Sequence, residues 1–493
     1  MKNGPTLKEI SVLLVLALTG IAVHGYHPAI EDAEIYLPGI KKALNASLYP
    51  HNDIFFMSHA RMTLFPKLIA ASVRVSHVPL DWALLLWQCL SIFLLLLACW
   101  HLGRLAFRNP LARWGGVLLV MSVLTLPVAG TALYIMDEYV TPRSLSTPAV
   151  LFIIINVIER RFVRAFLWAA FTAVIHPLMA VFGAGYALIY LLLTWPAETR
   201  AESRMERAVV PAGALIPFGL FPPVTEAYRQ ALSRRPYFFL MRWHWYEWLG
   251  IFAPLLIFGW WRSVARLRHE VVVEHLCLAS VIFGVLSFFA GLIITIPAQL
   301  ASFAELQPMR SLHLLYIIML VLGGGLLAQY VLKVEVWRWI LLLLPLCGVM
   351  FFVQRQTFPN TDHLELPWTR SHNEWVRAFE WIRRNTPVDA YFALDPETMS
   401  LPGEDQHGFR AIAERSMLAD NVKDTGAVTM FPAMAGSWLT QVQAQAGWPS
   451  FTASDFRALK QRFGVNWIVV AAPGVSNFEC PYIATQLAVC KVQ

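Results

Sequence analysis

The chain has 493 residues, of which 57% are hydrophobic and 14% are charged. A soluble domain carries about 25% charged residues, so this composition excludes an ordinary soluble protein and indicates one that crosses a membrane several times. The net charge of +7 does not indicate nucleic-acid binding, because the basic residues cluster between apolar runs, as they do in the cytoplasmic loops of membrane proteins.

Apolar runs of roughly the 20 residues that a bilayer requires recur through residues 1–355, which we expect to form a polytopic α-helical membrane module. The first run ends in His24-Gly-Tyr-His-Pro28 with no small-residue cleavage site, so we expect a retained helix and not a signal peptide. About eleven transmembrane helices are expected, over residues 10–26, 82–102, 114–133, 143–158, 165–177, 178–195, 208–224, 249–261, 271–296, 311–330 and 337–353.

The distribution of basic residues predicts the topology. If the N-terminus, with Lys2 and Lys8, lies in the cytoplasm, every loop on that side contains Lys or Arg, and these loops together hold more of them than the outer loops. This is the positive-inside bias of membrane proteins. An odd number of spans then places the region after about residue 355 on the outer side.

Two long outer loops stand out. In the first, residues 27–81, Ala33 to Leu44 has the pattern of a short amphipathic helix. Residues 62–78 are apolar, but Arg61, Lys67 and Arg74 recur through or beside them, and each charge at bilayer depth costs about 2.5–3.5 kcal/mol. We therefore expect an interfacial helix there and not a further span. The second loop, residues 225–248, is dense in aromatic residues with interleaved arginines, which is typical of a membrane interface.

The composition becomes polar after Arg355, and residues 360–493 are predicted to form a small α/β domain. Ser371-x-x-Glu374 is a capping box that predicts a helix over 375–384. A second helix is expected over 455–463, ending at Gly464, with strands over 391–394, 416–419 and 465–472 and a terminal strand pair. On the outer side, Cys480 and Cys490 can form a disulfide; the alternative is two unpaired thiols.

Two pairs of carboxylates fall on the outer side of this topology. Glu31 and Asp32 follow the first span, and Asp137 and Glu138 follow the third. Pairs at one membrane face can converge on one site. A carboxylate there can act as general base on a hydroxyl, or hold a divalent cation, Mg²⁺ or Mn²⁺, beside a phosphate leaving group. The alternative for both pairs is a solvated loop face.

Three basic or titratable residues lie on the same side. Arg143 and Arg310 stand at the heads of predicted spans, where arginine suits phosphate binding or, alternatively, snorkels to lipid headgroups. His176, between two apolar runs, is either a hydrogen-bonded core residue or a group that binds phosphate or shuttles a proton. Together these residues predict a site where a carrier lipid enters from the bilayer and an acceptor meets the carboxylates from the aqueous side.

The chain resembles the GT-C superfamily of polyprenol-linked glycosyltransferases, and within it a group of bacterial membrane proteins. The architecture carries part of the resemblance, with acids and interfacial helices in the first outer loop, about eleven spans and a C-terminal outer domain. Short segments carry the rest: Tyr26-His-Pro-x-x-Glu31-Asp32, Thr141-Pro-Arg143-Ser-Leu-Ser-Thr-Pro148, Ile175-His176-Pro177, Gln307-Pro-Met-Arg310 and Trp381-Ile-Arg-Arg-Asn-Thr-Pro387.

The resemblance implies an inverting glycosyltransferase with a carboxylate base at Glu31 or Asp32 and a polyprenyl-phosphate sugar as donor. The acceptor would be a glycan, lipid or protein of the cell envelope. The protein would lie in the bacterial inner membrane, with its C-terminal domain in the periplasm.

The sequence also departs from better-known members of the superfamily. Many of them have Asp-Asp or Asp-x-Asp where this chain has Glu31-Asp32. The Trp-Trp-Asp signature of oligosaccharyltransferases is missing, because Trp260-Trp261 is followed by Arg, which speaks against protein N-glycosylation.

Two other functions fit a membrane protein of this kind. One is a transporter or flippase for a lipid-linked or anionic substrate, although transporters usually show paired repeats and polar groups at the midplane, and the conspicuous charges here gather at one face. The other is a non-catalytic envelope scaffold whose outer domain binds a partner.

Overall fold

The computed structural model describes residues 4–195 and 224–493. Among these residues, seven helices are long and apolar enough to cross a membrane, and two shorter apolar helices accompany them. The long helices are α1 (Leu7–His24), α5 (Leu80–Ala106), α9 (Pro177–Thr194), α12 (Trp245–Leu267), α13 (Val271–Thr295), the run Leu300–Leu332 around α14 (Leu312–Leu327), and α15 (Val336–Thr357); the shorter ones are α7 (Pro142–Ile158) and α8 (Phe162–Ile175).

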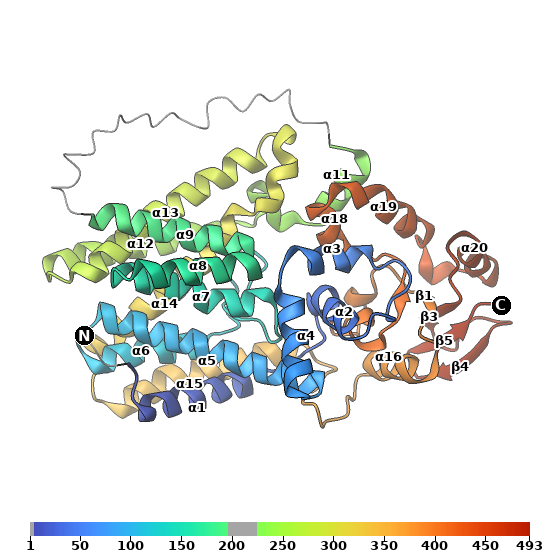
Figure 1. The fold of residues 1–493 in the computed structure, drawn as a ribbon, viewed down its shortest axis with the longest axis horizontal. Coiled ribbons are helices and arrows are strands. Elements are labelled where there is room, and N and C mark those ends of the chain that lie inside the picture. Colours follow the sequence, from blue (N-terminus) through green and yellow to red (C-terminus); the bar gives the residue numbers. More distant parts are fainter. Residues whose placement is uncertain (1–3, 196–223) are drawn as a thin grey trace.

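These helices form a bundle beside a smaller sheet domain (Figure 1). The structure therefore agrees with the predicted class, a helical membrane protein with a C-terminal α/β domain. The number of eleven spans stays a prediction, and the expected span over 208–224 lies, apart from Val224, outside the described residues.

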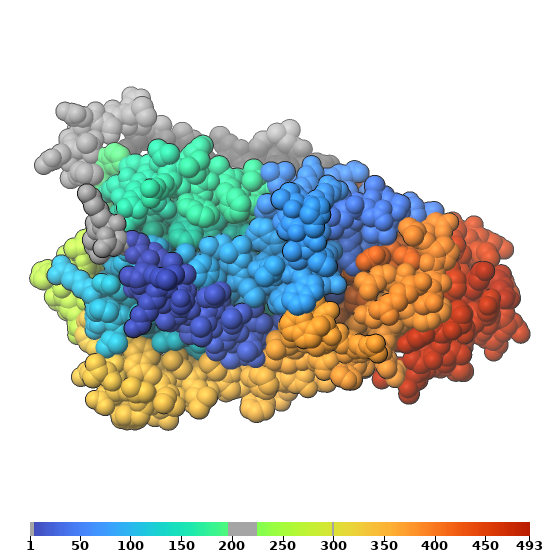
Figure 2. All heavy atoms as spheres, turned by 60° about the horizontal axis from the view of Figure 1, so that its bottom comes forward, coloured from blue at the N-terminus to red at the C-terminus, as the bar shows by residue number. Residues whose placement is uncertain are grey.

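Burial separates the centre of the bundle from its rim. Nearly all of α14 is buried, whereas α15 exposes large apolar side chains such as Leu344 and Phe352, as a helix that faces lipid does. Figure 2 shows α1 beside α15 on one face of the molecule. The helix α6 (Pro110–Ser122) approaches α14 so closely that a Cβ on Gly115 would collide with the carbonyl oxygen of Gly324, which is the close backbone packing that small residues permit in membranes.

One predicted span is shorter than expected. The sequence predicts a helix over 114–133, but α6 ends at Ser122, and an irregular segment follows as far as α7. Pro127 has no amide hydrogen and disfavours helix at the residue before it, and the backbone turns back on itself where Val128 N donates to Leu133 O at 2.8 Å. The released segment, residues 123–141, becomes a wall of the site described below.

The first long loop, residues 27–81 of the sequence prediction, folds into three short helices, α2 (Ala33–Leu44), α3 (Ile54–Met62) and α4 (Phe65–Ser76). The bounds of α2 are those predicted from the sequence. The 12 residues of α4 rise about 18 Å at 1.5 Å per residue, which is too short to cross a bilayer, in line with the expectation that no span lies here. In Figure 1 the three helices lie between the bundle and the sheet domain.

Short helical segments connect the later spans. The second long loop contains α11 (Glu226–Ser233), η2 (Pro236–Phe238) and η3 (Leu240–Arg242); the approach to α14 contains η4 (Ala298–Leu306) and η5 (Pro308–Ser311), and η6 (Ala328–Leu332) follows it.

The C-terminal domain is built on a five-stranded sheet of order β2-β1-β3-β5-β4. The pairs β1–β2 and β1–β3 are parallel, and the pairs β3–β5 and β4–β5 are antiparallel. The strands are β1 (Tyr391–Ala393), β2 (Ser416–Met417), β3 (Trp467–Ala471), β4 (Glu479–Ile483) and β5 (Leu487–Lys491). The helical segments are α16 (Glu374–Asn385), η7 (Thr398–Ser400), α17 (Phe409–Ala413), α18 (Asp424–Met430), η8 (Pro432–Met434), α19 (Ala435–Ala444), η9 (Trp448–Ser450) and α20 (Ala453–Phe463).

All five strands lie where the sequence predicts them, and α20 ends at Gly464, whose φ of 81° gives the left-handed cap expected of glycine. The predicted capping box is wrong. A capping box requires Glu374 at the third position of the helix, but α16 begins at Glu374. Asn373 caps the helix instead, and its side chain accepts hydrogen bonds from Trp375 N and Val376 N.

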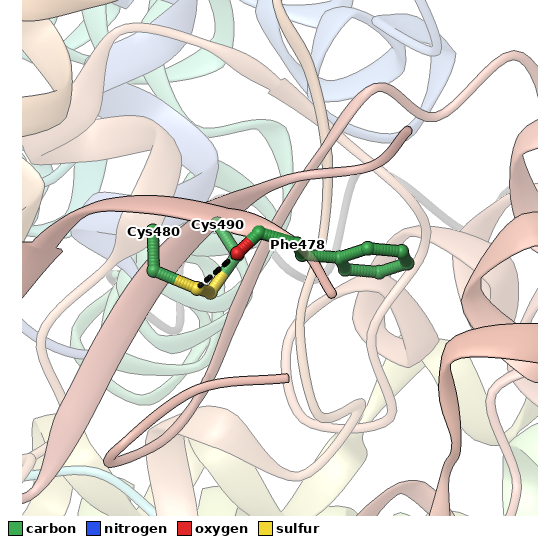
Figure 3. Close-up of a disulfide and its surroundings, with 3 residues drawn as sticks. All are labelled: Phe478, Cys480 and Cys490. Atoms are coloured by element: carbon green, nitrogen blue, oxygen red, sulfur yellow. Dashed lines mark hydrogen bonds between the residues drawn. A yellow bond between two sulfur atoms is a disulfide. The ribbon is translucent and has the colours of Figure 1, made fainter. Parts of the chain in front are cut away.

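A disulfide joins the last two strands (Figure 3). Cys480 of β4 and Cys490 of β5, the pair predicted from the sequence, are bonded with an S–S length of 2.00 Å. The disulfide links the two antiparallel strands of a hairpin and therefore ties the edge strand β4 to the sheet.

Candidate active site

Two cavities meet where the bundle, the first long loop and the C-terminal domain join. The larger has a volume of about 900 Å³ and is mainly lined by charged and polar residues; we call it the polar cavity. Its walls come from the first loop, the segment after α6, the start of the chain after α15, and the loops of the sheet domain. Its lining includes Glu31, Asp32, Tyr134, Asp137, Glu138, Tyr139, Arg143, Arg235, Tyr237, Arg310 and Lys423.

The smaller cavity has a volume of about 360 Å³ and a mostly apolar lining; we call it the apolar cavity. It lies between the first-loop helices, the α8–α9 junction and the approach to α14. It is lined by Asp32, Tyr36, His59, Met62, Thr63, Pro142, Arg143, Ile175, His176, Pro177, Leu178, Val181, Glu305, Leu306, Gln307, Arg310 and Met430. Some of its apolar residues are also exposed at the surface, Val181 to 66% and Met62 to 46%, so the cavity adjoins the lipid-facing side of the bundle.

Three residues line both cavities: Asp32, Arg143 and Arg310. The structure therefore brings together all seven residues singled out in the sequence. Glu31, Asp137 and Glu138 face the polar cavity only, and His176 faces the apolar cavity only. We call the three shared residues the common wall.

Glu31 and Asp32 are held by a lysine of the C-terminal domain. The Lys423 ammonium donates to Glu31 Oε2 and, at 3.2 Å, to Asp32 Oδ1. The Lys423 side chain is 6% exposed, while Glu31 and Asp32 are 37% and 33% exposed, so the acids face the cavity and the lysine lies behind them. Burial alone would raise the pKa of Asp32, but Lys423 and the arginines Arg143, Arg310 and Arg235 hold that pKa well below its usual range.

The backbone turns sharply at this pair. Glu31 has a φ of 52°, in the left-handed region that non-glycine residues seldom adopt. Its amide donates to Gln406 O at 2.9 Å, and the Asp32 amide donates to Tyr139 Oη at 3.2 Å. These contacts, one from the sheet domain and one from the segment after α6, fix the turn that aims both carboxylates at Lys423.

The second acid pair is divided between two environments. Asp137 accepts a hydrogen bond from Arg143 Nη2 at 2.6 Å, and both side chains are nearly buried, so this acid fixes the arginine of the common wall. Glu138 is 3% exposed, and its Oε1 has no hydrogen-bond partner among the described residues. Burial and the neighbouring charge of Asp137 raise the pKa of Glu138 to about 8, so at neutral pH its carboxyl is protonated and can donate a hydrogen bond.

The apolar cavity contains polar atoms without partners. Within residues 4–195 and 224–493, no hydrogen bond reaches four buried atoms of its lining: His59 Nδ1, Thr63 Oγ1, Gln307 Oε1 and Arg310 Nε. Buried polar atoms are nearly always paired in folded proteins. The four unpaired atoms leave hydrogen-bonding capacity in this cavity for a polar group. Burial also lowers the pKa of His59 to about 4, so this imidazole is neutral.

Sequence reasoning missed Lys423 and Arg235. Arg235 lies in the second long loop, which was predicted to be a membrane interface, but its guanidinium reaches the sheet domain and donates to Val422 O at 2.6 Å. Lys423 follows the turn Asp420-Asn-Val, a visible turn signal, but nothing local indicates that it faces Asp32 in a distant part of the chain.

A buried ionic network joins the turn that carries Lys423 to the first loop. Arg410 of α17 bonds Asp424 of α18 at 2.7 Å and Glu34 of α2 at 3.3 Å. Asp420 Oδ1 accepts the amides of Val422, Lys423 and Asp424 at 2.6–3.0 Å. The two sides of the Lys423 contact are thus anchored to one another through Arg410.

The donor set does not suit a divalent cation. Mg²⁺ and Mn²⁺ require several free oxygen ligands, but Lys423 occupies Glu31 and Asp32, and Arg143 occupies Asp137. Across the part of the chain that the structure describes, no group of three His, Cys, Asp or Glu side chains is placed to hold a metal ion.

No protein-family model and no curated protein matches the chain. Among solved structures, it is similar to the oligosaccharyltransferase of the archaeon Archaeoglobus fulgidus in its apo form, and to the same enzyme in complex with an inhibitory peptide and a dolichol-phosphate. Each match has 14% identity and a TM-score of 0.40, and covers 94% of this chain and 69% of the other. A likeness at this score carries no argument about the site.

Proposed function

We propose that the protein is an integral-membrane glycosyltransferase that transfers a sugar from a polyprenyl-phosphate donor to a cell-envelope acceptor at the periplasmic face of the bacterial inner membrane. One observation carries the proposal. An apolar cavity and a polar cavity share a wall that consists of one carboxylate, Asp32, and two guanidinium groups, Arg143 and Arg310. A lipid-linked substrate and a water-soluble one can meet at such a wall and nowhere else in the two cavities.

The apolar cavity fits the lipid side of the donor. The first isoprene units contact residues such as Ile175, Leu178 and Val181, and the remaining chain stays in the bilayer. The donor phosphate lies against Arg310 and Arg143, because guanidinium groups match phosphate oxygens in geometry and keep their charge. The unpaired atoms of His59, Thr63 and Gln307 lie in the same cavity and supply further hydrogen bonds to the phosphate or the first sugar.

The polar cavity fits the sugar and its acceptor. Tyr134, Tyr139 and Tyr237 provide aromatic surface, and Glu138 provides a carboxyl that is protonated at neutral pH. Asp32 is the proposed general base, because it alone among the four carboxylates borders both cavities. Its low pKa keeps it ionised, and Glu31 shares the charge of Lys423 with it.

The reaction that follows is a single displacement. Asp32 takes the proton of the acceptor hydroxyl while the acceptor oxygen forms a bond to the anomeric carbon. The bond from that carbon to the phosphate oxygen breaks, and the electron pair leaves with the polyprenyl phosphate, which Arg143 and Arg310 stabilise. Attack from the side opposite the phosphate inverts the anomeric configuration.

The test uses the purified full-length protein in liposomes. Polyprenyl-phosphate glucose, mannose and galactose, each labelled in the sugar, are supplied with envelope fractions from cells that lack the protein. The proposal predicts covalent label in a glycan, lipid or protein fraction, and loss of that label with Asp32→Asn. Movement of intact labelled lipid across the liposome membrane without covalent transfer would instead identify a flippase.

A further inference from the structure

Lys423 is placed where a cation is needed. Its ammonium lies between the carboxylates of two consecutive residues, Glu31 and Asp32, one of which borders both cavities. Adjacent carboxylates repel one another, and the pair stays ionised beside a phosphate only if a positive charge offsets the repulsion. In many sites a divalent metal ion supplies that charge; here the Lys423 ammonium makes the largest contribution at Asp32, followed by Arg143, Arg310 and Arg235.

The lysine is fixed before any substrate arrives. Three backbone amides of its turn are held by Asp420, and the carbonyl oxygens of Val422 and Lys423 accept hydrogen bonds from Arg235. The Arg410 network then ties this turn to α2, the helix that follows Asp32. A charge held this firmly needs little reorganisation during the reaction. A lysine on a mobile loop would need more.

The charges around the common wall are matched without a further cation. Lys423 neutralises the first acid pair in part, Arg143 is paired with Asp137, and Arg310 faces the ring of Tyr237 at 5.7 Å. A divalent ion at Glu31 and Asp32 would have to displace Lys423, whose side chain is buried and has no other carboxylate partner among the described residues. Leaving a buried ammonium unpaired costs several kcal/mol.

We propose that the Lys423 ammonium takes the place of a divalent cation at this carboxylate pair, so that sugar transfer proceeds without a metal ion. The inference rests on the proposed function. Lys423 acts as a positioning residue: it holds Asp32 ionised and directed at the acceptor hydroxyl, and the proton, the new glycosidic bond and the leaving phosphate follow the step described above.

The experiment compares wild type with Lys423→Met, Lys423→Arg and the control Lys42→Met. The control breaks a lysine–aspartate pair of the same loop, Lys42 with Asp53 at 2.5 Å, away from both cavities. Full-length protein in liposomes is assayed for transfer with and without EDTA, Mg²⁺ and Mn²⁺. Independently of activity, bound Mn²⁺ is counted by electron paramagnetic resonance. Thermal unfolding establishes that each variant is folded.

The wild type is expected to keep its activity in EDTA and to bind no Mn²⁺ at Asp32. Lys423→Met is expected to lower kcat by about 100-fold, the order of effect seen when one fixed charge or donor is removed, with the donor KM within a few-fold. It is also expected to gain one Mn²⁺ site that disappears in the double variant with Asp32→Asn, and to recover part of its kcat in Mn²⁺ or Mg²⁺. Lys423→Arg is expected to retain most of the activity, and Lys42→Met all of it.

Three results would overturn the inference: a wild type inactivated by EDTA and restored by Mn²⁺, a Lys423→Met variant that transfers sugar at the wild-type rate, or no Asp32-dependent Mn²⁺ site in that variant. If the wild type transfers no sugar from any donor, the proposed function fails, and the Mn²⁺ count alone decides whether Lys423 occupies a cation position. The two failures are therefore distinguishable.

Discussion

The polar and apolar cavities share three residues but differ in how their polar groups are satisfied. In the polar cavity, the charged groups are largely paired within the protein: Lys423 with Glu31 and Asp32, and Arg143 with Asp137. In the apolar cavity, buried atoms of His59, Thr63 and Gln307 have no partner among the described residues.

This difference indicates that the two cavities serve different steps. A cavity with paired charges presents a fixed electrostatic environment to a transition state. A cavity with unpaired polar atoms leaves a desolvation cost of about 1–3 kcal/mol per atom that a bound ligand removes. The first is suited to chemistry, and the second is suited to binding, so substitutions in the two cavities should affect different kinetic constants.

Asp32→Asn should have the largest effect. Removal of the general base is expected to lower kcat about 1,000-fold, within the range of such losses, without weakening donor binding. Glu31→Gln, the matched control in the neighbouring position, should lower kcat by no more than about tenfold, because Glu31 borders only the polar cavity. Steady-state transfer kinetics measure both, and full activity in both variants would eliminate this carboxylate pair as the source of the base.

Arg310→Ala should come next and should act on binding. Loss of charge-assisted hydrogen bonds worth about 1.5–3 kcal/mol predicts a drop of roughly 10- to 150-fold in affinity for polyprenyl phosphate, measured without any sugar. Arg242→Ala, an exposed arginine that lines neither cavity, is the control. If the affinity of Arg310→Ala for polyprenyl phosphate is unchanged, the phosphate does not bind at the common wall.

The pH dependence should separate the cavities further. Where the first loop meets the sheet domain, His407 contacts Glu365 at 3.0 Å, and Glu365 contacts His27 at 3.1 Å. Burial alone would lower the pKa of His407, but Glu365 raises it to about 9. A raised histidine pKa stabilises the folded state fully below about pH 6.5, and this stabilisation is lost as the pH rises through about 9.

The corresponding loss is about 3 kcal/mol in total. It should loosen the sheet domain, which lines much of the polar cavity but contributes only Met430 to the apolar one. Between pH 7 and 9 Glu138 also loses its proton, so the thermal midpoint and the transfer rate should fall for two reasons while polyprenyl-phosphate affinity holds. His407→Gln should show a smaller pH dependence of the midpoint, and an identical dependence would contradict the assignment.

Removal of the Cys480–Cys490 disulfide should have the smallest effect on the site. Closing a loop of 10 residues is worth about 2–3 kcal/mol through the unfolded state, so the double Ser variant should unfold at a lower temperature. Its β-hairpin lines neither cavity, and both kcat and donor affinity should stay within about twofold of wild type. A larger loss of kcat would show that this hairpin supports the polar cavity.

Local patterns in the sequence were sufficient for much of the fold. The amphipathic pattern of residues 33–44 predicted α2, the glycine after residue 463 marked the end of α20, and apolar runs located the strands and most of the long helices. The site acids were found because charges are rare in this chain, so a carboxylate pair beside a span is conspicuous.

The remainder depends on contacts between distant segments. Lys423 meets Asp32 across 391 positions of the chain, and only the docking of the sheet domain onto α2 brings them together. The early end of α6 follows from Pro127. The prediction of a longer helix followed the apolar residues around this proline and did not take the proline into account. The division into two cavities could not be predicted either, because it depends on side-chain packing at the common wall.

The most direct test is a structure of the full-length protein in a lipid environment with polyprenyl phosphate bound. The account predicts the isoprene chain in the apolar cavity, the phosphate in hydrogen-bond contact with Arg310 and Arg143, and Asp32 on the polar side of that phosphate. A phosphate bound elsewhere, with Arg310 still beside the ring of Tyr237 and the four polar atoms of the apolar cavity still unpaired, would contradict it.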